Sequence, residues 1–402
     1  MAGERMADAW ATVALVGLAV SVTVGCAQVI GADWDGYARG EGGGDSTGGM
    51  VGTGGNAGAA GAQGDGGSGG GASSTAVSGG GGEGGEGGEG GCAVCKAGEF
   101  CTASEMCVRC VDRGGALSFG APMAIEVEGA RPAFPRVREE PAEGEGVATQ
   151  RLVYVATFGS SDAQIATATG WPWTAGEVVA SAAVNSPQSE SGPLLLPVDA
   201  PSPRADFPEG SLLFDRVIAG PGSLPLLFVA DRLEASQVET FDALNLDGGS
   251  HSVAVAHGVW PYRYWFMNKH QEGGQVTSRL LTTLDGGVEA QELHIVLPGD
   301  CPAQGDDLAP WVTPDGSVLF FQAPYSARGD CAQASVLRSF YVRLGADGLP
   351  APGDKAKMLL VSLEPESAVM TPSLSPDECT LYVASDLDPV DRKQRLYAAS
   401  RR

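Results

Sequence analysis

Near its end the sequence contains the stretch Thr371-Pro-Ser-Leu-Ser-Pro-Asp-Glu-Cys-Thr-Leu-Tyr-Val-Ala-Ser385. An imperfect copy lies upstream, at Ala309-Pro-Trp-Val-Thr-Pro-Asp-Gly-Ser-Val-Leu-Phe-Phe-Gln322. In both copies a Pro-Asp turn leads into a short apolar strand. A turn-plus-strand unit that recurs is typical of repeat architectures, in which each unit packs against its neighbours. At one common offset, the copies match at Pro310 and Pro372, Pro314 and Pro376, Asp315 and Asp377, and Leu319 and Leu381.

From about residue 115 onward the chain has an all-β pattern. No long apolar run has a helical period, whereas paired apolar runs bounded by Gly, Pro, Asp and Ser are frequent. Further strands are expected at 124–127 and 212–214. The hairpins that this pattern predicts are 152–156 with 164–167, 226–230 with 238–241, 262–266 with 276–281, 318–321 with 340–344, and 381–384 with 395–399.

The repeat Pro-x-apolar-Ser/Thr-Pro-Asp-x-x-x-Leu-aromatic resembles the WD40-like repeats of TolB-type β-propellers. The resemblance implies that residues 115–402 form an all-β propeller of five or six blades, whose last strand closes the ring with N-terminal residues. The residues Pro314-Asp315-Gly316 and Pro376-Asp377 are then structural: each Asp accepts backbone hydrogen bonds inside its turn. A β-sandwich with similar hairpins is the alternative fold.

Residues 1–25 are interpreted as an export signal, because a short apolar run is followed by small residues. The ending Thr23-Val-Gly-Cys26 resembles the lipobox of bacterial lipoproteins, which implies that Cys26 is lipidated and becomes the new N-terminus. Ala27 then favours the outer membrane, with the protein facing the periplasm or the cell surface. A plain export signal and an uncleaved anchor are the alternatives.

Residues 26–91 are predicted to be a flexible, disordered linker behind that anchor. From Gly40 to Gly91 more than half of the positions are Gly, and such a segment cannot bury enough apolar surface to offset its ordering entropy. About 50 such residues span on the order of 40 Å as a coil. This length would hold the folded part clear of the bilayer.

A small Cys-rich segment follows at 92–111. In a cytosolic protein its two Cys-x-x-Cys pairs would indicate zinc, but behind an export signal disulfides are expected instead. With Cys26 set aside, an odd number of cysteines remains both in this segment and in the large domain, which predicts one bridge between the two sets or one free thiol in each. Cys301–Cys331 is the natural local pair, which leaves Cys379 as the odd one. The cysteines expected to form disulfides are Cys92, Cys95, Cys101, Cys107, Cys110, Cys301, Cys331 and Cys379.

Charge excludes some classes of partner. Acidic residues outnumber basic ones by 49 to 25, which argues against nucleic acid and against electrostatic attachment to an anionic membrane face. The only membrane contact expected is therefore the lipid at Cys26.

No catalytic, cofactor or metal site is predicted from the sequence. The four His residues have no metal-binding spacing and are expected to be surface or satisfied polar side chains. Asp306-Asp307 is interpreted as solvated, and Asp386-Leu-Asp388-Pro-Val-Asp391 as a hairpin tip, because it lacks the Gly and Glu of a calcium loop. The aromatic clusters at 171–173 and 260–265 are expected to pack between blades; the alternative is that some are exposed on loops, where they could stack on sugars or grip a peptide.

The sequence thus predicts a non-enzymatic, lipid-anchored envelope protein whose propeller binds a protein, peptide or glycan partner. One alternative is a propeller-type carbohydrate-active hydrolase or lyase, which would need converging carboxylates that the sequence does not single out. Another is a passive structural protein of the envelope. Neither the ligand nor the oligomeric state follows from the sequence.

Overall fold

The computed structural model describes residues 99–101, 107–112, 116–141, 149–159, 162–171, 173, 175–203, 210–218, 224–246, 248–272, 275–284, 289–305, 307–326, 336–359, 367–386 and 393–402. The predicted signal, Cys26, the Gly-rich linker, Cys92, Cys95 and Cys331 all lie outside these residues. The predictions made for them, including the lipid anchor, remain predictions.

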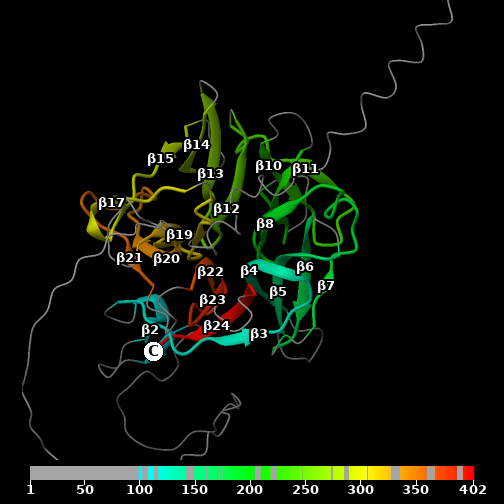
Figure 1. Ribbon diagram of the computed structural model, residues 1–402, viewed down its shortest axis with the longest axis horizontal. Coiled ribbons are helices and arrows are strands. Elements are labelled where there is room, and N and C mark those ends of the chain that lie inside the picture. Colours follow the sequence, from blue (N-terminus) through cyan, green and yellow to red (C-terminus); the bar gives the residue numbers. More distant parts are fainter. Residues whose placement is uncertain are drawn as a thin grey trace, which may run out of the picture.

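The described residues form an all-β propeller of five blades, as Figure 1 shows, so the predicted fold class is confirmed and the blade number is five. Each blade is a four-stranded antiparallel sheet whose first strand lies nearest the axis. Blades I to III consist of β4 (Ala130–Glu140), β5 (Thr149–Thr157), β6 (Ala163–Thr169) and β7 (Glu177–Val178); β8 (Glu190–Leu195), β9 (Leu212–Val217), β10 (Pro225–Ala230) and β11 (Val238–Thr240); and β12 (Ser250–Ala256), β13 (Arg263–Glu272), β14 (Gln275–Leu284) and β15 (Gln291–Glu292).

Blade V closes the ring. Its outermost strand, β3, comes from the N-terminal side of blade I and pairs with β24, the last strand of the chain, as the sequence predicted. All five predicted hairpins are also present, one in each blade. Blades IV and V consist of β18 (Trp311–Val312), β19 (Val318–Tyr325), β20 (Val336–Arg343) and β21 (Lys357–Met358); and β22 (Val369–Leu374), β23 (Thr380–Ser385), β24 (Arg395–Ser400) and β3 (Met123–Ile125), while β16 (Val296–Leu297) and β17 (Cys301–Pro302) form a separate hairpin before blade IV.

The middle strands are apolar on both faces because each blade is covered on both faces by its neighbours. In β23, Leu381 and Val383 enter the core that blade V shares with blade IV. Tyr382 and Ala384, on the other face of the same strand, enter the core that reaches blade I. Side chains alternate between the two faces of a strand, so a strand buried on both sides has a continuous apolar sequence.

In or just before every inner strand, one left-handed residue occupies the same place in its blade, and β4 has a second one at Arg131. These residues have φ between 42° and 54°, and four of the five precede a proline. The strand pairing shifts register at this point in β4, β8, β12 and β22, which is the signature of a β-bulge. The residues are Phe134, Gly192, Ser252, Ala309 and Thr371.

Hydrogen bonds across the blade boundaries stabilise this unusual backbone. The Thr371 N–H donates to Gln322 Oε1 of blade IV at 2.8 Å, and the Phe134 N–H donates to Thr371 Oγ1 of blade V at 3.1 Å. A left-handed non-glycine residue costs roughly 1–2 kcal/mol, and such residues persist where the surrounding structure holds them. The inner bulges therefore also join neighbouring blades around the axis.

The C-terminal part of the Cys-rich segment is fastened to the exit face, defined as the face on which the inner strands end. Cys110, in the 3₁₀ turn η1 (Cys110–Asp112), forms a disulfide with Cys379 beside the β22–β23 turn. This is the bridge between the two cysteine sets that the sequence predicted. Cys107 and Cys301 are disulfide-bonded as well. Cys107 lies in β2 (Cys107–Arg109), which pairs with β1 (Glu99–Cys101).

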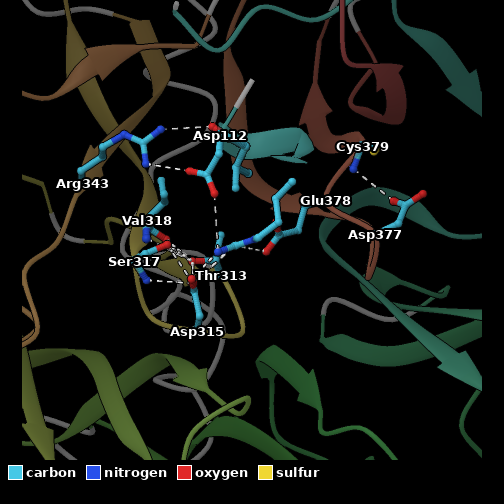
Figure 2. A network of polar contacts seen from close by, with 11 residues as sticks. Asp112, Thr313, Asp315, Ser317, Val318, Arg343, Asp377, Glu378 and Cys379 are labelled. Carbon is cyan, nitrogen blue, oxygen red and sulfur yellow. Dashed lines mark hydrogen bonds and ion pairs between the residues drawn. The ribbon is translucent and has the colours of Figure 1, made fainter. Parts of the chain in front are cut away.

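A network of ion pairs surrounds this disulfide (Figure 2). Arg109 pairs with Asp315 of the β18–β19 turn and with Glu378 of the β22–β23 turn, and Arg343 donates to Asp112 at 3.0 Å. Burial alone would lower the pKa of Arg109, but its hydrogen bonds to Glu378 and Asp315 raise it instead. We call the disulfide and these ion pairs the exit-face clamp.

We predict that Cys379→Ser lowers the free energy of unfolding by about 2–4 kcal/mol, because the disulfide joins residues 269 positions apart and restricts the unfolded chain. Urea unfolding without reductant measures the loss. Reduction should then lower the stability of the wild type more than that of the variant. Equal unfolding midpoints for the two oxidised proteins would show that the clamp does not stabilise the propeller.

Candidate functional site

A buried acid lies at the centre of blade II. Asp215 is in β9, is 3% exposed, and accepts a hydrogen bond at each carboxylate oxygen: from Ser191 Oγ at 2.7 Å and from the Ser252 N–H of blade III at 3.0 Å. Gly192 allows this approach, since a Cβ there would lie 2.5 Å from Asp215 Oδ1. The bulges of two inner strands therefore hold the carboxyl in place.

A second buried acid reaches the same point from blade IV. The Asp307 side chain is 7% exposed, and its Oδ1 accepts a 2.7 Å hydrogen bond from the N–H of Ala309, the left-handed residue of that blade. His251 Nδ1 lies 3.9 Å from Asp307 Oδ1. The buried Lys269 of β13 lines the same space.

These groups surround a cavity of about 10 Å³ near the entry face, where the inner strands begin. That volume is about enough for one water molecule. Ser189 and Val217, which are only half-buried, bring the lining to the surface. We call Asp215, His251, Lys269 and Asp307 the axial cluster.

Burial is the main cause of the unusual titration of the cluster. It raises the pKa of Asp215 to about 6, with a further contribution from the charge of Asp307, although the hydrogen bonds from Ser252 and Ser191 act in the opposite direction. Burial also raises the pKa of Asp307, against the opposing effects of its hydrogen bonds and of the charges on Lys269 and Arg136. Burial and Lys269 lower the pKa of His251 well below its usual range, so its imidazole is neutral at physiological pH.

One atom of the cluster is left without a hydrogen bond. Within the described part of the chain, the buried Nε2 of His251 has no partner. A buried polar atom without a partner costs free energy, and in native structures such atoms are uncommon. This nitrogen is therefore available to a water or to a ligand hydroxyl.

Arg136 separates the axial cluster from the other half of the propeller axis. Its guanidinium is buried and donates to three backbone carbonyls around the axis, those of Pro135, Pro310 and Pro372, at 3.0–3.4 Å. Burial lowers its pKa to about 9, although the charge of Asp307 opposes this shift.

Several residues singled out in the sequence are placed differently from the predictions. Asp307 is buried at the axis and not solvated, because the turn before β18 points it inward. His251 and His257 are in buried environments that lower the pKa of each. Asp386 accepts a hydrogen bond from the Ala368 N–H, and the rest of its acidic loop lies outside the described residues.

The Pro-Asp turns lie on the exit face, away from the cluster. Asp315 Oδ1 accepts hydrogen bonds from Ser317 N–H, Ser317 Oγ and Thr313 Oγ1, and Asp377 Oδ1 accepts one from the Cys379 N–H. These carboxylates make turn and clamp contacts. Pro314, Gly316 and Pro376 belong to the same two turns.

Most members of the aromatic clusters are parts of the core, but Trp171 and Trp260 are exposed. Trp173 is 2% exposed and packs edge-on against Tyr382 of blade V, which is the packing between blades that was expected. Tyr262, Tyr264 and Trp265 are also buried.

The axial cluster was not predicted from the sequence, although two signals for it were present. Asp215 directly follows the apolar run Leu212-Leu-Phe214 inside a predicted strand, and burial of such a strand implies a buried charge. The second signal is a proline in or just before four of the inner strands. Each of these prolines directly follows the left-handed residue at which the strand bulges. Proline inside a strand is typical of a bulge.

No protein-family model matches the sequence, and no curated protein matches it. Several solved structures do match over about two thirds of the chain. A glycosyl hydrolase from Bacteroides ovatus is 11% identical, with 67% of this chain and 84% of that chain covered and a TM-score of 0.40. An α-L-arabinofuranosidase from Podospora anserina is 9% identical, with coverages of 71% and 96% and a TM-score of 0.39. A protein of unknown function from Dyadobacter fermentans is 10% identical, with coverages of 70% and 98% and a TM-score of 0.42.

The prediction of a non-enzymatic binding protein is corrected, because the ground on which it was made does not hold. Seven of the solved structures that match carry names of glycoside-cleaving enzymes, which is a statement about those proteins. The prediction depended on the lack of converging carboxylates, and the fold brings Asp215 and Asp307 together at the axis from separate blades. The pair could not be predicted from the sequence, because the two acids belong to different blades and are far apart along the chain.

Among the described residues, no group of three or more His, Cys, Asp or Glu side chains has a geometry suited to a metal ion. The only helices described are two 3₁₀ turns, η1 and η2 (Pro298–Asp300), so no described helix is long and apolar enough to cross a membrane.

We predict that Asp215 makes the wild type less stable as the pH rises. Its pKa is raised in the folded state, so its contribution is fully present below about pH 4 and is lost as the pH passes about 6. The loss between these limits is on the order of 2–3 kcal/mol. Asp215→Asn has no charge to bury and should remove this part of the slope.

Urea unfolding between pH 4 and pH 7 measures the effect, with the exposed Asp354→Asn as the matched control. The control should keep the wild-type slope. A wild-type slope in Asp215→Asn would contradict the buried titration of Asp215.

Proposed function

We propose that the protein is a carbohydrate-active hydrolase that cleaves a glycosidic bond at the axial cluster. The observation that carries the proposal is the convergence of two buried carboxyls, Asp215 and Asp307, on one small cavity lined by blades II and III and by the segment before β18. Cleavage of a glycosidic bond by two carboxyl groups needs one acid that protonates the leaving oxygen and a second that acts as base or nucleophile.

The environments of the two acids suggest their roles. The charge of Asp307 helps to raise the pKa of Asp215, so Asp215 holds its proton to about pH 6 and is suited to be the general acid. Burial raises the pKa of Asp307 as well, but the charges of Lys269 and Arg136 oppose the rise, and we assign Asp307 the role of base. It would accept a proton from the one water that the cavity holds, and Asp215 would protonate the departing oxygen of a sugar that enters past the half-buried Ser189 and Val217.

The neighbouring groups would position the reactants. His251 is neutral and its Nε2 has no partner among the described residues, so it offers a hydrogen bond to a sugar hydroxyl or to the attacking water. The Ser191 and Ser252 contacts fix the orientation of Asp215, so that its proton points in a defined direction.

Turnover on a panel of polysaccharides and aryl glycosides tests the proposal. We expect hydrolysis by the wild type with a bell-shaped pH profile of kcat/KM, and a loss of about 10²–10⁴-fold in Asp215→Asn and in Asp307→Asn. Loss of the acid should affect substrates with a poor leaving group more than those with a good one, a difference that a purely structural role would not produce.

Asp354→Asn is the matched control and should keep wild-type activity. Circular dichroism and the melting temperature establish whether each variant is folded. If no substrate in the panel is hydrolysed, or if both folded cluster variants keep full activity, the proposal is wrong.

A further inference from the structure

A second and much larger cavity lies at the other end of the axis, on the exit face. Its volume is about 540 Å³, within the range of pockets that hold small ligands. It is lined by the ends of the inner strands or by the residues that follow them, and all five blades contribute. Arg136 lies between this exit pocket and the axial cluster, so the two cavities are separate sites.

The wall of the exit pocket is largely apolar. Its side chains include Leu194, Val255, Val312 and Leu374, which are 8% exposed or less. Val198 is 38% exposed and also belongs to the lining, so it marks the opening. Apolar walls of this extent favour an occupant with an apolar body, since burying its surface contributes to affinity.

The inner end of the pocket is a cation. Arg136 is 5% exposed and lines the pocket, and its hydrogen bonds go to backbone carbonyls alone. Among the described residues, no carboxylate lies within ion-pair distance of it, and the charge of Asp307 acts on it only from farther away. A buried guanidinium without an adjacent anion is costly, and a carboxylate that pairs with it forms a strong, charge-assisted hydrogen bond.

The other charged groups of the lining do not provide that anion. Arg138 is already paired with Glu140 at 2.6 Å, although its Nε has no partner among the described residues. Glu139 and Asp199 are exposed. His257 is held neutral by burial, which lowers its pKa to about 4. A positive inner end with apolar walls thus remains.

We propose that the exit pocket binds a small amphipathic carboxylate, an aliphatic acid whose carboxylate pairs with Arg136 and whose chain lies along the apolar wall. The lining of this pocket includes no member of the axial cluster, so the binding test below does not require the proposed glycosidase activity, although Arg136 also faces Asp307. The ligand and the pocket match in two ways: the carboxylate is opposite in charge to Arg136, and the aliphatic chain covers the apolar wall.

Displacement of a dansyl-labelled undecanoic acid from the full-length protein tests the proposal, with decanoate and 1-decanol as competitors. The two competitors have the same chain and differ in the anion. Decanoate should displace the probe at a concentration at least about tenfold lower than 1-decanol, because only it pairs with Arg136.

Two variants locate the site. Val198→Trp places a large side chain at the opening. It should weaken the binding of the probe and of both competitors by about tenfold or more. Val259→Trp is the matched control, an exposed valine that does not line the pocket, and should leave binding unchanged. Arg136→Gln should remove the preference for decanoate over 1-decanol, and Arg136→Lys, which keeps the charge, should retain part of it.

The proposal is overturned if the probe does not bind saturably, if decanoate and 1-decanol compete equally with the wild type, or if Val198→Trp binds as well as Val259→Trp. Should Arg136→Gln fail to fold, the comparison of the two competitors on the wild type and the pair of valine variants still decide the matter. Binding that depends on Val198 but not on the carboxylate would indicate an apolar ligand without an anion and would also contradict the proposal.

Discussion

The left-handed residue on each inner strand is the constraint on which the rest of the propeller depends. At Ser252 and Thr371 it turns the backbone N–H toward the preceding blade, where Asp215 and Gln322 accept it. The same bulges shape the axis, because they place the polar residues near the start of the inner strands on the entry face and leave the apolar ends of those strands on the exit face. The bulge with its left-handed residue thus joins neighbouring blades, and it separates a polar end of the axis from an apolar end.

The polar end of the axis is unfavourable for stability, because the axial cluster is buried there. Asp215, Asp307, His251 and Lys269 are all buried, and burial of charge is unfavourable unless partners compensate it. Hydrogen bonds from Ser191, Ser252 and Ala309 offset part of the cost of burying these charges. The part that is not offset shifts the pKa values of the acids and of His251. Such perturbed groups gather at functional sites, because a fold that only needed stability would place apolar side chains there. The clamp on the exit face supplies stability elsewhere, through Cys110–Cys379 and the Arg109 ion pairs.

The sequence predicted the outer parts of the blades well and the axis poorly. Runs such as Leu381-Tyr-Val-Ala384 signal a strand by themselves, because their apolar continuity follows from burial on both faces. The inner strands β4 and β8 contain prolines and charged residues, and those features argue against a strand unless the bulge is already known. Asp215 and Asp307 meet only because the ring closes, and no local pattern encodes that meeting. The functional prediction failed for the same reason: a site assembled from several blades has no motif in any one of them.

A carbon-detected NMR titration of the Asp215 carboxyl, in the wild type and in Asp307→Asn, tests whether Asp215 and Asp307 form a buried pair of acids whose charges interact. We expect a pKa of about 6 in the wild type and a lower pKa in the variant, since the charge of Asp307 is one cause of the shift. If Asp215 titrates near the ordinary value of about 3.9 in both proteins, the two acids are neither buried together nor coupled, and the proposed active site is wrong.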